Sequence, residues 1–403
     1  MKRKYTGTIP AISLMFVFCF VLGVQAQENA AEDPIQTQDP IRLFITGNIH
    51  DKTAAVQQVS QTPESADTLS LMAIDYVLDY VPTLGADSDF LQLAQAAVAA
   101  LGTPPAEQTV PRLNTLFRIF SDDTLRTAVL EKLSYYTQTK PAQTAGSVAI
   151  VNAFLTESLK PNATVGEAHL AAIRLLETAK SQSSFSVLFS YVLRGPNAQL
   201  SSAARDALNV LLPDGMQNIV RILTVNPSSE KLEIFNLVCE NPQLSDAFKA
   251  ETATNALEKT IYNTEDISWV DQELIRLHLE ALGVLSELSW TKAAAAVMQL
   301  FNLCQKEYES GLLSDTQFSS VIEQTASLAA DQASPVLISY LNALNKETEE
   351  TGLCSEPVVL AVITALGELG DKAAFDYLLY VTYLDYPEPV IQAARNALAG
   401  LKW

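Results

Sequence analysis

One stretch of the chain has the residue types that could bind a phosphate group. Residues 365–374 read ALGELGDKAA, so that Gly367 and Gly370 are followed by Asp371 and Lys372. In a phosphate-binding loop the glycines follow a strand and precede a helix whose N-terminus faces the anion. Here residues 358–369 have helical periodicity, and no Ser or Thr follows Lys372 to meet a nucleotide's magnesium ion. We therefore predict a joint between two helices, in which Gly370 ends the first helix and Asp371 caps the second.

The histidines, cysteines and serines show no catalytic or metal-binding pattern. His50, His169 and His278 are far apart in the chain. The ligand spacings His-x-x-x-His, Cys-x-x-Cys and Glu-x-x-His do not occur, and neither does the serine elbow Gly-x-Ser-x-Gly. His169 lies in a helix-forming stretch, which favours a core or solvent-facing residue over a catalytic one. We therefore predict no cofactor, no metal ion and no catalytic residue.

Paired carboxylates leave one enzymatic alternative open. Glycosidases act through two carboxyl groups, and some are built from α/α helix pairs. However, a chain with 46 acidic residues also forms such pairs by accident. Asp87-x-Asp89 lacks the further oxygen ligands and the glycine of a calcium loop. The pairs in this sequence are Asp87/Asp89, Asp122/Asp123, Glu265/Asp266 and Glu349/Glu350.

A row of tyrosines is the most unusual side-chain pattern. Tyr377, Tyr380, Tyr383 and Tyr386 occur at every third residue. On a helix such a row drifts around the axis, so that only part of it can belong to the core. The row either packs against the preceding helices with its hydroxyl groups in solvent, or it forms an aromatic surface that binds a partner protein.

Composition favours a helical and acidic protein. Hydrophobic residues make up 48% of the 403 residues, and glycines number only 15. The formal charge of −20 argues against nucleic acids and anionic membranes, because both are bound mainly through Lys and Arg. A partner protein with a basic surface is compatible with this charge, although the charge also serves solubility alone.

The N-terminus predicts export. Residues 1–4 are MKRK, residues 11–24 are apolar, and Val24-Gln25-Ala26 resembles a cleavage site. We predict a signal peptide at 1–26, a flexible acidic tether at 27–40, and a periplasmic, cell-envelope or secreted location. The apolar run is shorter than a membrane span, and no later segment reaches that length, so we expect no membrane insertion after cleavage.

The cysteines that remain after cleavage do not form a disulfide framework. Cys239, Cys304 and Cys354 are odd in number and widely spaced. Buried thiols are favoured over one bridge with a free thiol, which stays open.

A helical unit recurs along the chain. Residues 173–208 align with residues 363–398 without a gap over 36 positions, sharing Phe185/Phe375, Leu188/Leu378 and the ending Ala-Ala-Arg-x-Ala-Leu. Further units begin near residues 280 and 321. In the last unit Phe375, Leu378, Leu379 and Tyr383 are spaced to form one buried stripe on a first helix. A Pro-rich break then precedes a second helix.

The last unit resembles the HEAT-repeat family. In that family the second helix typically runs Asp-x-x-Pro-x-Val-Arg-x-Ala-Ala-x-x-Ala-Leu-Gly. Ile391 stands where the family has arginine, which puts the usual Asp–Arg ladder between repeats in doubt. The resemblance is clearest at 358–401 and extends to 165–212 and 279–345. The matching positions are Asp385, Val390, Ala393, Ala394, Ala397 and Leu398.

The resemblance implies an all-α fold, a right-handed α-α superhelix (solenoid) of HEAT-like helical hairpins over residues 41–403. It also implies a non-enzymatic scaffold that binds another protein. The alternatives are an envelope carbohydrate-active enzyme of the α/α type and a purely structural spacer. Tyr377, Tyr380, Tyr383 and Tyr386 are the candidate contact residues.

Overall fold

The structure is a computed structural model that describes residues 39–59, 63–85, 87–102, 105–262 and 271–402. Within these ranges the chain forms nineteen α-helices and several short 3-10 turns, and no strand. The prediction of an all-α fold is therefore confirmed. The predicted signal peptide lies outside the described residues, as does the predicted tether apart from its last two residues, Asp39 and Pro40, which begin the first helix.

The helices follow one another along the whole chain, separated by short connections. The first ten are α1 (Pro40–Thr46), α2 (Ile49–Val59), α3 (Pro63–Leu84), α4 (Ser88–Ala100), α5 (Thr109–Ile119), α6 (Asp123–Thr139), α7 (Pro141–Ser158), α8 (Glu167–Ala179), α9 (Phe185–Arg194) and α10 (Ala198–Leu211). The others are α11 (Met216–Val225), α12 (Ser228–Glu240), α13 (Asp246–Thr260), α14 (Gln272–Glu287), α15 (Ala294–Glu309), α16 (Asp315–Thr351), α17 (Glu356–Leu369), α18 (Phe375–Val381) and α19 (Glu388–Gly400).

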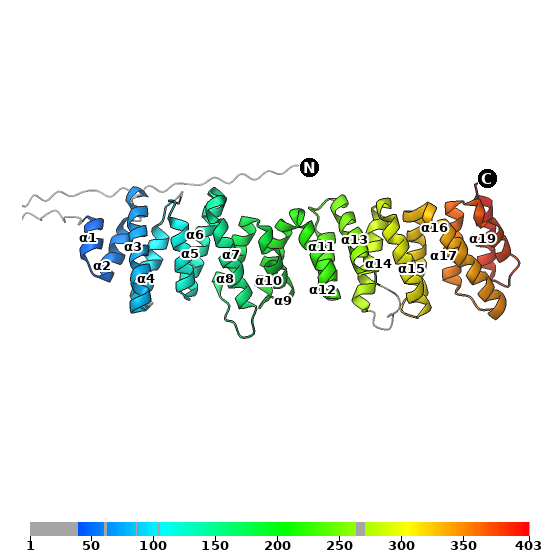
Figure 1. Ribbon diagram of the computed structural model, residues 1–403, viewed down its shortest axis with the longest axis horizontal. Helices are drawn as coiled ribbons and strands as arrows, with labels where there is room; N and C mark the ends of the chain where they lie inside the picture. The colour runs from blue at the N-terminus through cyan, green and yellow to red at the C-terminus, as the bar shows by residue number, and fades with distance from the viewer. Residues whose placement is uncertain (1–38, 60–62, 86, 103–104, 263–270, 403) are drawn as a thin grey trace, which may run out of the picture.

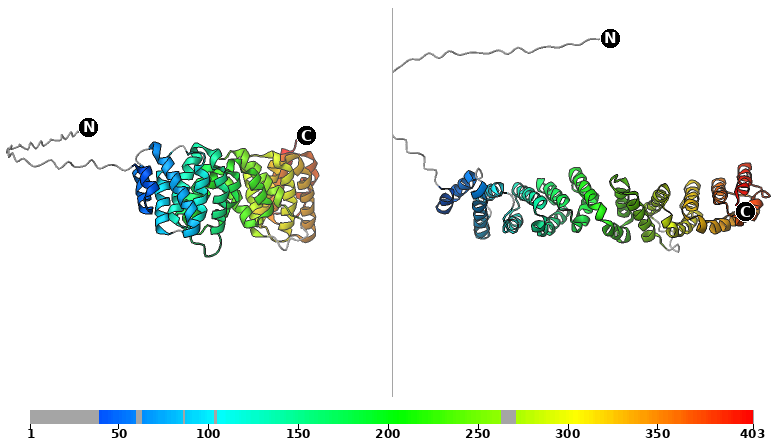
Figure 2. Two further views of the ribbon diagram at one scale, coloured as in Figure 1. Left: turned by 60° about the vertical axis from the view of Figure 1, so that its left-hand side comes forward. Right: turned by 90° about the horizontal axis from the view of Figure 1, so that it is seen from above.

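The helices stand side by side in a long row that begins at α1 and ends at α19 (Figure 1). Seen from above, they form two layers (Figure 2). Alternate helices pack within a layer: α4 contacts α2 and α6, and α5 contacts α3 and α7. Buried hydrophobic side chains form one continuous cluster from Phe44 in α1 to Leu401 after α19. Each helix pair is thus stabilised mainly by the pairs beside it in sequence.

Three helices end in the same local structure. Lys180 (φ 50°), Ser289 (φ 50°) and Gly370 (φ 69°) adopt the left-handed conformation just after α8, α14 and α17. In each case a 3-10 turn follows and leads directly into the next helix. These turns are η1 (Gln182–Ser184), η4 (Thr291–Ala293) and η5 (Lys372–Ala374).

The stretch GELGDK is such a joint, as predicted. The Gly370 amide donates to the Leu366 carbonyl at 3.0 Å, and Asp371 Oδ1 accepts from the Ala373 amide at 2.9 Å. Gly367 lies within α17, where a Cβ atom would be 2.9 Å from Ala397 Cβ on α19. The first glycine therefore permits close helix packing and the second permits the left-handed turn.

The two aligned sequence segments have the same order of elements. Residues 173–208 run from α8 through η1 and α9 into α10, and residues 363–398 run from α17 through η5 and α18 into α19. Leu188 and Leu378, which align, are both fully buried. The gapless alignment therefore reflects a repeated arrangement of helices.

The predicted unit at residues 321–341 differs from expectation. It lies inside α16, a single helix of 37 residues with a kink at Ala329, where φ is −120° and ψ is 16°. Pro335 follows within the same helix and cannot donate to the carbonyl four residues before it. The two halves of α16 therefore meet at a kink, without the loop that separates other helix pairs.

Substitution of Gly370 tests the joint. Gly370→Ala places a Cβ atom at a left-handed residue, 3.1 Å from Lys402 Cε, and we expect it to lower the free energy of unfolding by about 1–2 kcal/mol. Gly146→Ala is the matched control, because Gly146 is exposed within α7 and a Cβ atom there would have no neighbour within 4 Å. It should stabilise the protein by about 0.5–1 kcal/mol. Denaturant unfolding measures both changes, and equal effects would contradict the joint.

Candidate functional site

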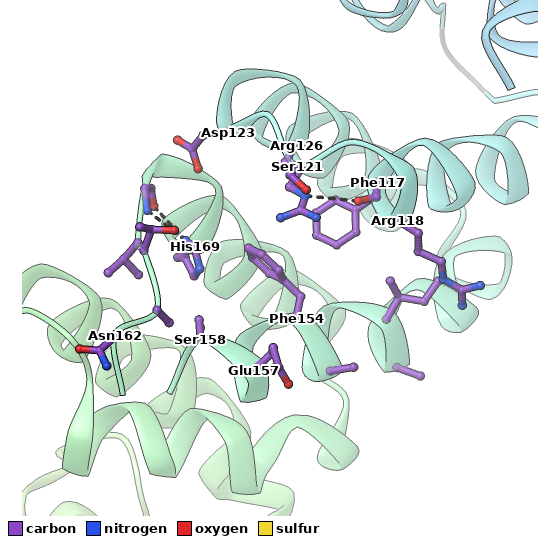
Figure 3. A pocket seen from close by; sticks show the side chains of 17 residues that line it. Phe117, Arg118, Ser121, Asp123, Arg126, Phe154, Glu157, Ser158, Asn162 and His169 are labelled. Atoms are coloured by element: carbon purple, nitrogen blue, oxygen red, sulfur yellow. Dashed lines mark hydrogen bonds between the residues drawn. The ribbon is translucent and has the colours of Figure 1, made fainter. Parts of the chain in front are cut away.

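A cleft of about 880 Å³ opens between α5, α6, α7 and the connection to α8 (Figure 3). The ends of α5 and α6 supply one wall, α7 supplies the floor, and residues 162–166 with His169 close the other side. The connection between α7 and α8 spans residues 159–166 and contains no helix. The cleft therefore lies where two successive helices are joined by one of the longer described connections.

An arginine between two phenylalanine rings forms one side of the cleft. The Arg126 guanidinium carbon lies 5.3 Å from the ring centroids of both Phe117 and Phe154. Its Nε atom donates to the Phe117 carbonyl at 3.3 Å. The two rings meet edge to face, with centroids 5.1 Å apart. Partial burial lowers the pKa of Arg126, the nearby Asp123 opposes that shift, and an arginine remains charged at any physiological pH.

Asp123 connects this wall to the helix opposite. Its carboxylate accepts hydrogen bonds from the amides of Glu167 at 2.9 Å and Ala168 at 3.2 Å, which open α8. A carboxylate at this position satisfies unpaired amides and complements the positive end of the helix dipole. A Cβ atom on Gly166 would lie 2.4 Å from the Asp123 oxygens, so only glycine fits beside this contact.

His169, in the first turn of α8, contributes to the cap at the N-terminus of that helix. Its Nδ1 atom accepts a hydrogen bond from the Gly166 amide at 3.1 Å, and its ring packs on Phe154 with centroids 4.5 Å apart. Burial lowers the pKa of His169, which favours the neutral ring, and Nδ1 also lies 3.3 Å from the Gly166 carbonyl. Of the two non-catalytic positions expected for His169, the core is the correct one, since the residue is buried.

The carboxylates of the cleft already have partners. Asp123 binds two backbone amides, and Glu157 forms an ion pair with Lys160 at 2.6 Å. Acid–base hydrolysis of a glycoside needs one carboxyl group that can give a proton and another that can act on the sugar or on water. Both carboxylates that line the cleft thus have a hydrogen-bond or ion-pair partner, although the Glu157–Lys160 pair is exposed.

The four tyrosines do not form one surface, in contrast to the predicted contact set. α18 ends at Val381, so that Tyr383 lies in the following turn and Tyr386 in the connection to α19. Tyr383 is 76% exposed and Tyr380 is 37% exposed, whereas Tyr386 is only 4% exposed. The Tyr386 hydroxyl donates to the Asn345 side chain at 3.1 Å.

Two predictions about these tyrosines are therefore wrong. Tyr386 belongs to the core, and Tyr383 does not share the buried stripe of Leu378, because the helix ends before it. Tyr377 is half-buried and packs against the core. Tyr380 and Tyr383 remain as exposed candidates.

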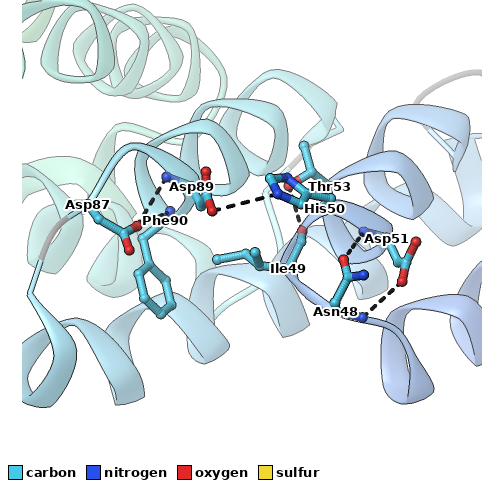
Figure 4. Close-up of polar contacts among 8 residues, drawn as sticks. All are labelled: Asn48, Ile49, His50, Asp51, Thr53, Asp87, Asp89 and Phe90. Carbon is cyan, nitrogen blue, oxygen red and sulfur yellow. Dashed lines mark hydrogen bonds and ion pairs between the residues drawn. The ribbon is translucent and has the colours of Figure 1, made fainter.

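The pair Asp87/Asp89 and His50 form local contacts near the start of α4. Asp87 is the N-cap of α4 and accepts from the Asp89 amide at 3.1 Å and the Phe90 amide at 3.0 Å (Figure 4). His50 Nε2 lies 3.8 Å from Asp89 in an exposed contact. The pair Glu265/Asp266 lies outside the described residues.

The described residues contain no metal cluster and no disulfide bond. No group of three or more His, Cys, Asp or Glu side chains among them is arranged to hold a metal ion. Cys239, Cys304 and Cys354 are free thiols, of which Cys304 is buried and Cys354 exposed. Within the same part of the chain, no helix is both long and apolar enough to cross a membrane.

Sequence reasoning did not identify Phe117, Arg126 and Phe154. They lie on three different helices, α5, α6 and α7, and only the packing of those helices brings them together. Their spacing matches no motif. The pair Asp122/Asp123 just before Arg126 was the nearest signal, since it marks the start of α6 and one wall of the cleft.

His278 is a buried histidine outside the cleft. Its Nε2 atom lies 2.8 Å from the Thr260 hydroxyl, whose own proton goes to the Ala256 carbonyl, so that Nε2–H donates. Its Nδ1 atom has no hydrogen-bond partner in the described structure. Burial, together with the charge of Lys231, lowers the pKa of His278 to about 4.

The capping role of His169 can be tested by two substitutions. His169→Ala leaves the Gly166 amide without its acceptor, and we expect it to lower the free energy of unfolding by about 1–2 kcal/mol. His169→Gln is the matched variant, because glutamine at this position of a helix closes the same hydrogen bond. It should recover more than half of the loss in a denaturant titration. Equal destabilisation by both variants would show that the contact with Phe154 matters instead.

His278 predicts a loss of stability in acid. Its pKa is about 4 in the folded chain and about 6.5 when unfolded, so the unfolded state binds the proton first as the pH falls. Folding stability should therefore fall between pH 6.5 and pH 4, by about 3 kcal/mol in total from this group, with no further loss below that range.

His278→Gln is the control for this pH dependence. Glutamine keeps the donor to Thr260 and removes the titration, while Lys231, the charge that acts on His278, remains unchanged in both proteins. As the pH falls, the free energy of unfolding should decrease more for the wild-type protein than for His278→Gln. At low pH the variant should therefore become the more stable of the two. Parallel curves from pH 7 to pH 4 would contradict the assignment.

Comparison with known proteins adds no relative. No model of a known protein family matches the chain, and no curated protein is significantly similar to it. The case for a function therefore rests on the sequence pattern and on the geometry of the described residues.

Proposed function

We propose that the chain is an exported, non-enzymatic scaffold that holds another protein in the cell envelope. In this proposal the two-layered row of helices is a right-handed superhelix of HEAT-like hairpins. The observation that carries it is the recurrence of one joint, with a left-handed residue and a 3-10 turn, after α8, α14 and α17. A recurring joint with neighbour-to-neighbour packing is typical of helical repeat proteins.

The packing favours an extended binding surface over a single enclosed active site. Helices contact mainly the preceding and following pairs, so both long faces of the row remain available to a large partner (Figure 1). The cleft beside α7 has its carboxylates in use, as described above. Both features support protein binding over glycoside hydrolysis.

Charge and exposed tyrosines suggest where a partner binds. The formal charge of −20 favours a partner with a basic surface, because complementary charges speed and select association. Tyr383 is 76% exposed and Tyr380 37%, and tyrosine is enriched at the sites that dominate interface energies. We propose that these two residues contact the partner, without Tyr386.

Crosslinking in cells tests the scaffold. The tagged mature chain is crosslinked in the envelope, its partner is identified by mass spectrometry, and binding is then measured with both purified proteins. We expect saturable binding that weakens as salt increases, and a loss of roughly tenfold or more when Tyr380 and Tyr383 are both changed to Ser.

Tyr135→Ser is the matched control, because Tyr135 is 46% exposed and lies on α6, far along the row from α18. It should leave the affinity unchanged. A parent protein without any saturable partner would favour the structural spacer. Hydrolysis of an envelope glycan by the purified chain would instead support the enzymatic alternative.

A further inference from the structure

The cleft beside α7 contains a cation, Arg126, that forms no ion pair within the described residues, although the Asp123 carboxylate lies nearby. Arg126 is half-buried, and its Nε atom is fixed by the Phe117 carbonyl. Among the described residues, no acceptor lies within hydrogen-bonding distance of its two terminal nitrogens. Partial removal of a charge from water is costly unless that charge is paired. The terminal nitrogens of the guanidinium are therefore available to an acceptor that the described chain does not supply.

The remaining polar groups of the cleft indicate the charge that a bound ligand should carry. The acids are matched, since Asp123 binds the amides of Glu167 and Ala168, and Glu157 binds Lys160. His169 Nδ1 accepts from the Gly166 amide, and in the tautomer that makes this bond Nε2 carries the proton. The charged groups of the lining that have no ion pair among the described residues are thus the guanidinium groups of Arg118 and Arg126, which suits an anion.

The apolar part of the lining indicates which kind of chemical group is attached to the anion. Phe117 and Phe154 flank the guanidinium, and Ala149, Ile150 and Ala153 continue the apolar surface along α7. A volume of about 880 Å³ is within the range of pockets that hold small molecules or a terminal side chain of a peptide. An acceptor with an attached hydrophobic group would cover this surface.

We propose that the cleft binds a carboxylate attached to an aromatic or aliphatic group. The carboxylate pairs with the terminal nitrogens of Arg126, and the apolar group lies against Phe117 and Phe154. Arginine and a carboxylate form two parallel hydrogen bonds, which a single guanidinium can supply. A monoanion is favoured over a phosphate dianion, because Asp123 and Glu157 also line the cleft and would repel a second charge.

This site does not depend on the proposed scaffold function. The same chemistry could come from a free aromatic acid or from the C-terminal residue of a peptide. Both sources place a carboxylate next to an apolar side chain, so both can be tested with matched acid and amide probes.

The first experiment uses the wild-type chain from residue 27 onward. Calorimetry and ligand-observed NMR measure the affinity for 3-phenylpropanoate and for its neutral amide. The peptide Gly-Gly-Ala-Phe is compared with its C-terminal amide in the same way. We expect the acid of at least one pair to bind roughly tenfold or more tightly than its amide.

The two pairs distinguish the sources. Tighter binding of the free peptide than of 3-phenylpropanoate would assign the site to a peptide C-terminus, and the reverse would assign it to a small acid. Equal affinity of acid and amide, or no binding of either pair at millimolar concentration, would overturn the proposal.

Substitution of Arg126 tests whether this residue binds the carboxylate of the ligand. Arg126→Gln should abolish the preference for acid over amide. Arg174→Gln is the control for net charge, because Arg174 is exposed on α8 and does not line the cleft. An unchanged preference in Arg126→Gln would overturn the proposal.

A second pair of variants keeps the test valid if Arg126→Gln does not fold. Ala153 is exposed in the cleft on α7, where a longer side chain has room. Ala153→Glu places a competing carboxylate beside the guanidinium and should weaken binding of the acid by roughly tenfold or more relative to Ala153→Gln. Equal acid binding by these two variants would overturn the proposal.

Discussion

The fold depends on one constraint, which is that no helix pair can bury its apolar face by itself. Burial of apolar surface contributes about 25 cal/mol per Å², and a two-helix unit has too little surface of its own to balance the cost of ordering the chain. Here the next pair supplies the missing surface. Buried side chains consequently form one cluster from Phe44 to Leu401, and the structure grows in length as pairs are added.

The same constraint accounts for the joint that recurs at three of the described connections. A helix that packs on its neighbour must reverse direction within a few residues, or its apolar stripe loses register with the next one. A left-handed residue followed by a 3-10 turn achieves this after α8, α14 and α17. Glycine adopts that conformation at the least cost, yet Lys180 and Ser289 also adopt it, so the packing of the helices outweighs a local penalty at those two positions.

Features that are local in sequence could be predicted, and features made by packing could not. The helical class, the joint at Gly370 and the cap at Asp371 follow from the spacing and chemistry of neighbouring residues, and they were found as expected. The prediction that Tyr383 lies on the buried stripe and that Tyr386 contacts a partner was wrong. A period of three residues does not show where a helix ends, and α18 ends at Val381. The unit expected to begin near residue 321 lies inside α16, whose two halves meet at a kink at Ala329 and not at a loop. The cleft was missed because Phe117, Arg126 and Phe154 come from three helices.

The position of the cleft follows from the way the row is built. Between α7 and α8 the compact joint is replaced by the connection at 159–166, which leaves space where another joint would bring helices into contact. Asp123 and His169 then hold the start of α8 by hydrogen bonds. Those bonds use the Asp123 carboxylate, whereas Arg126 forms no ion pair among the described residues, although the chain as a whole carries an excess of acids. The polar lining of the cleft is therefore found at one of the longer described connections, where no compact joint brings successive helices together.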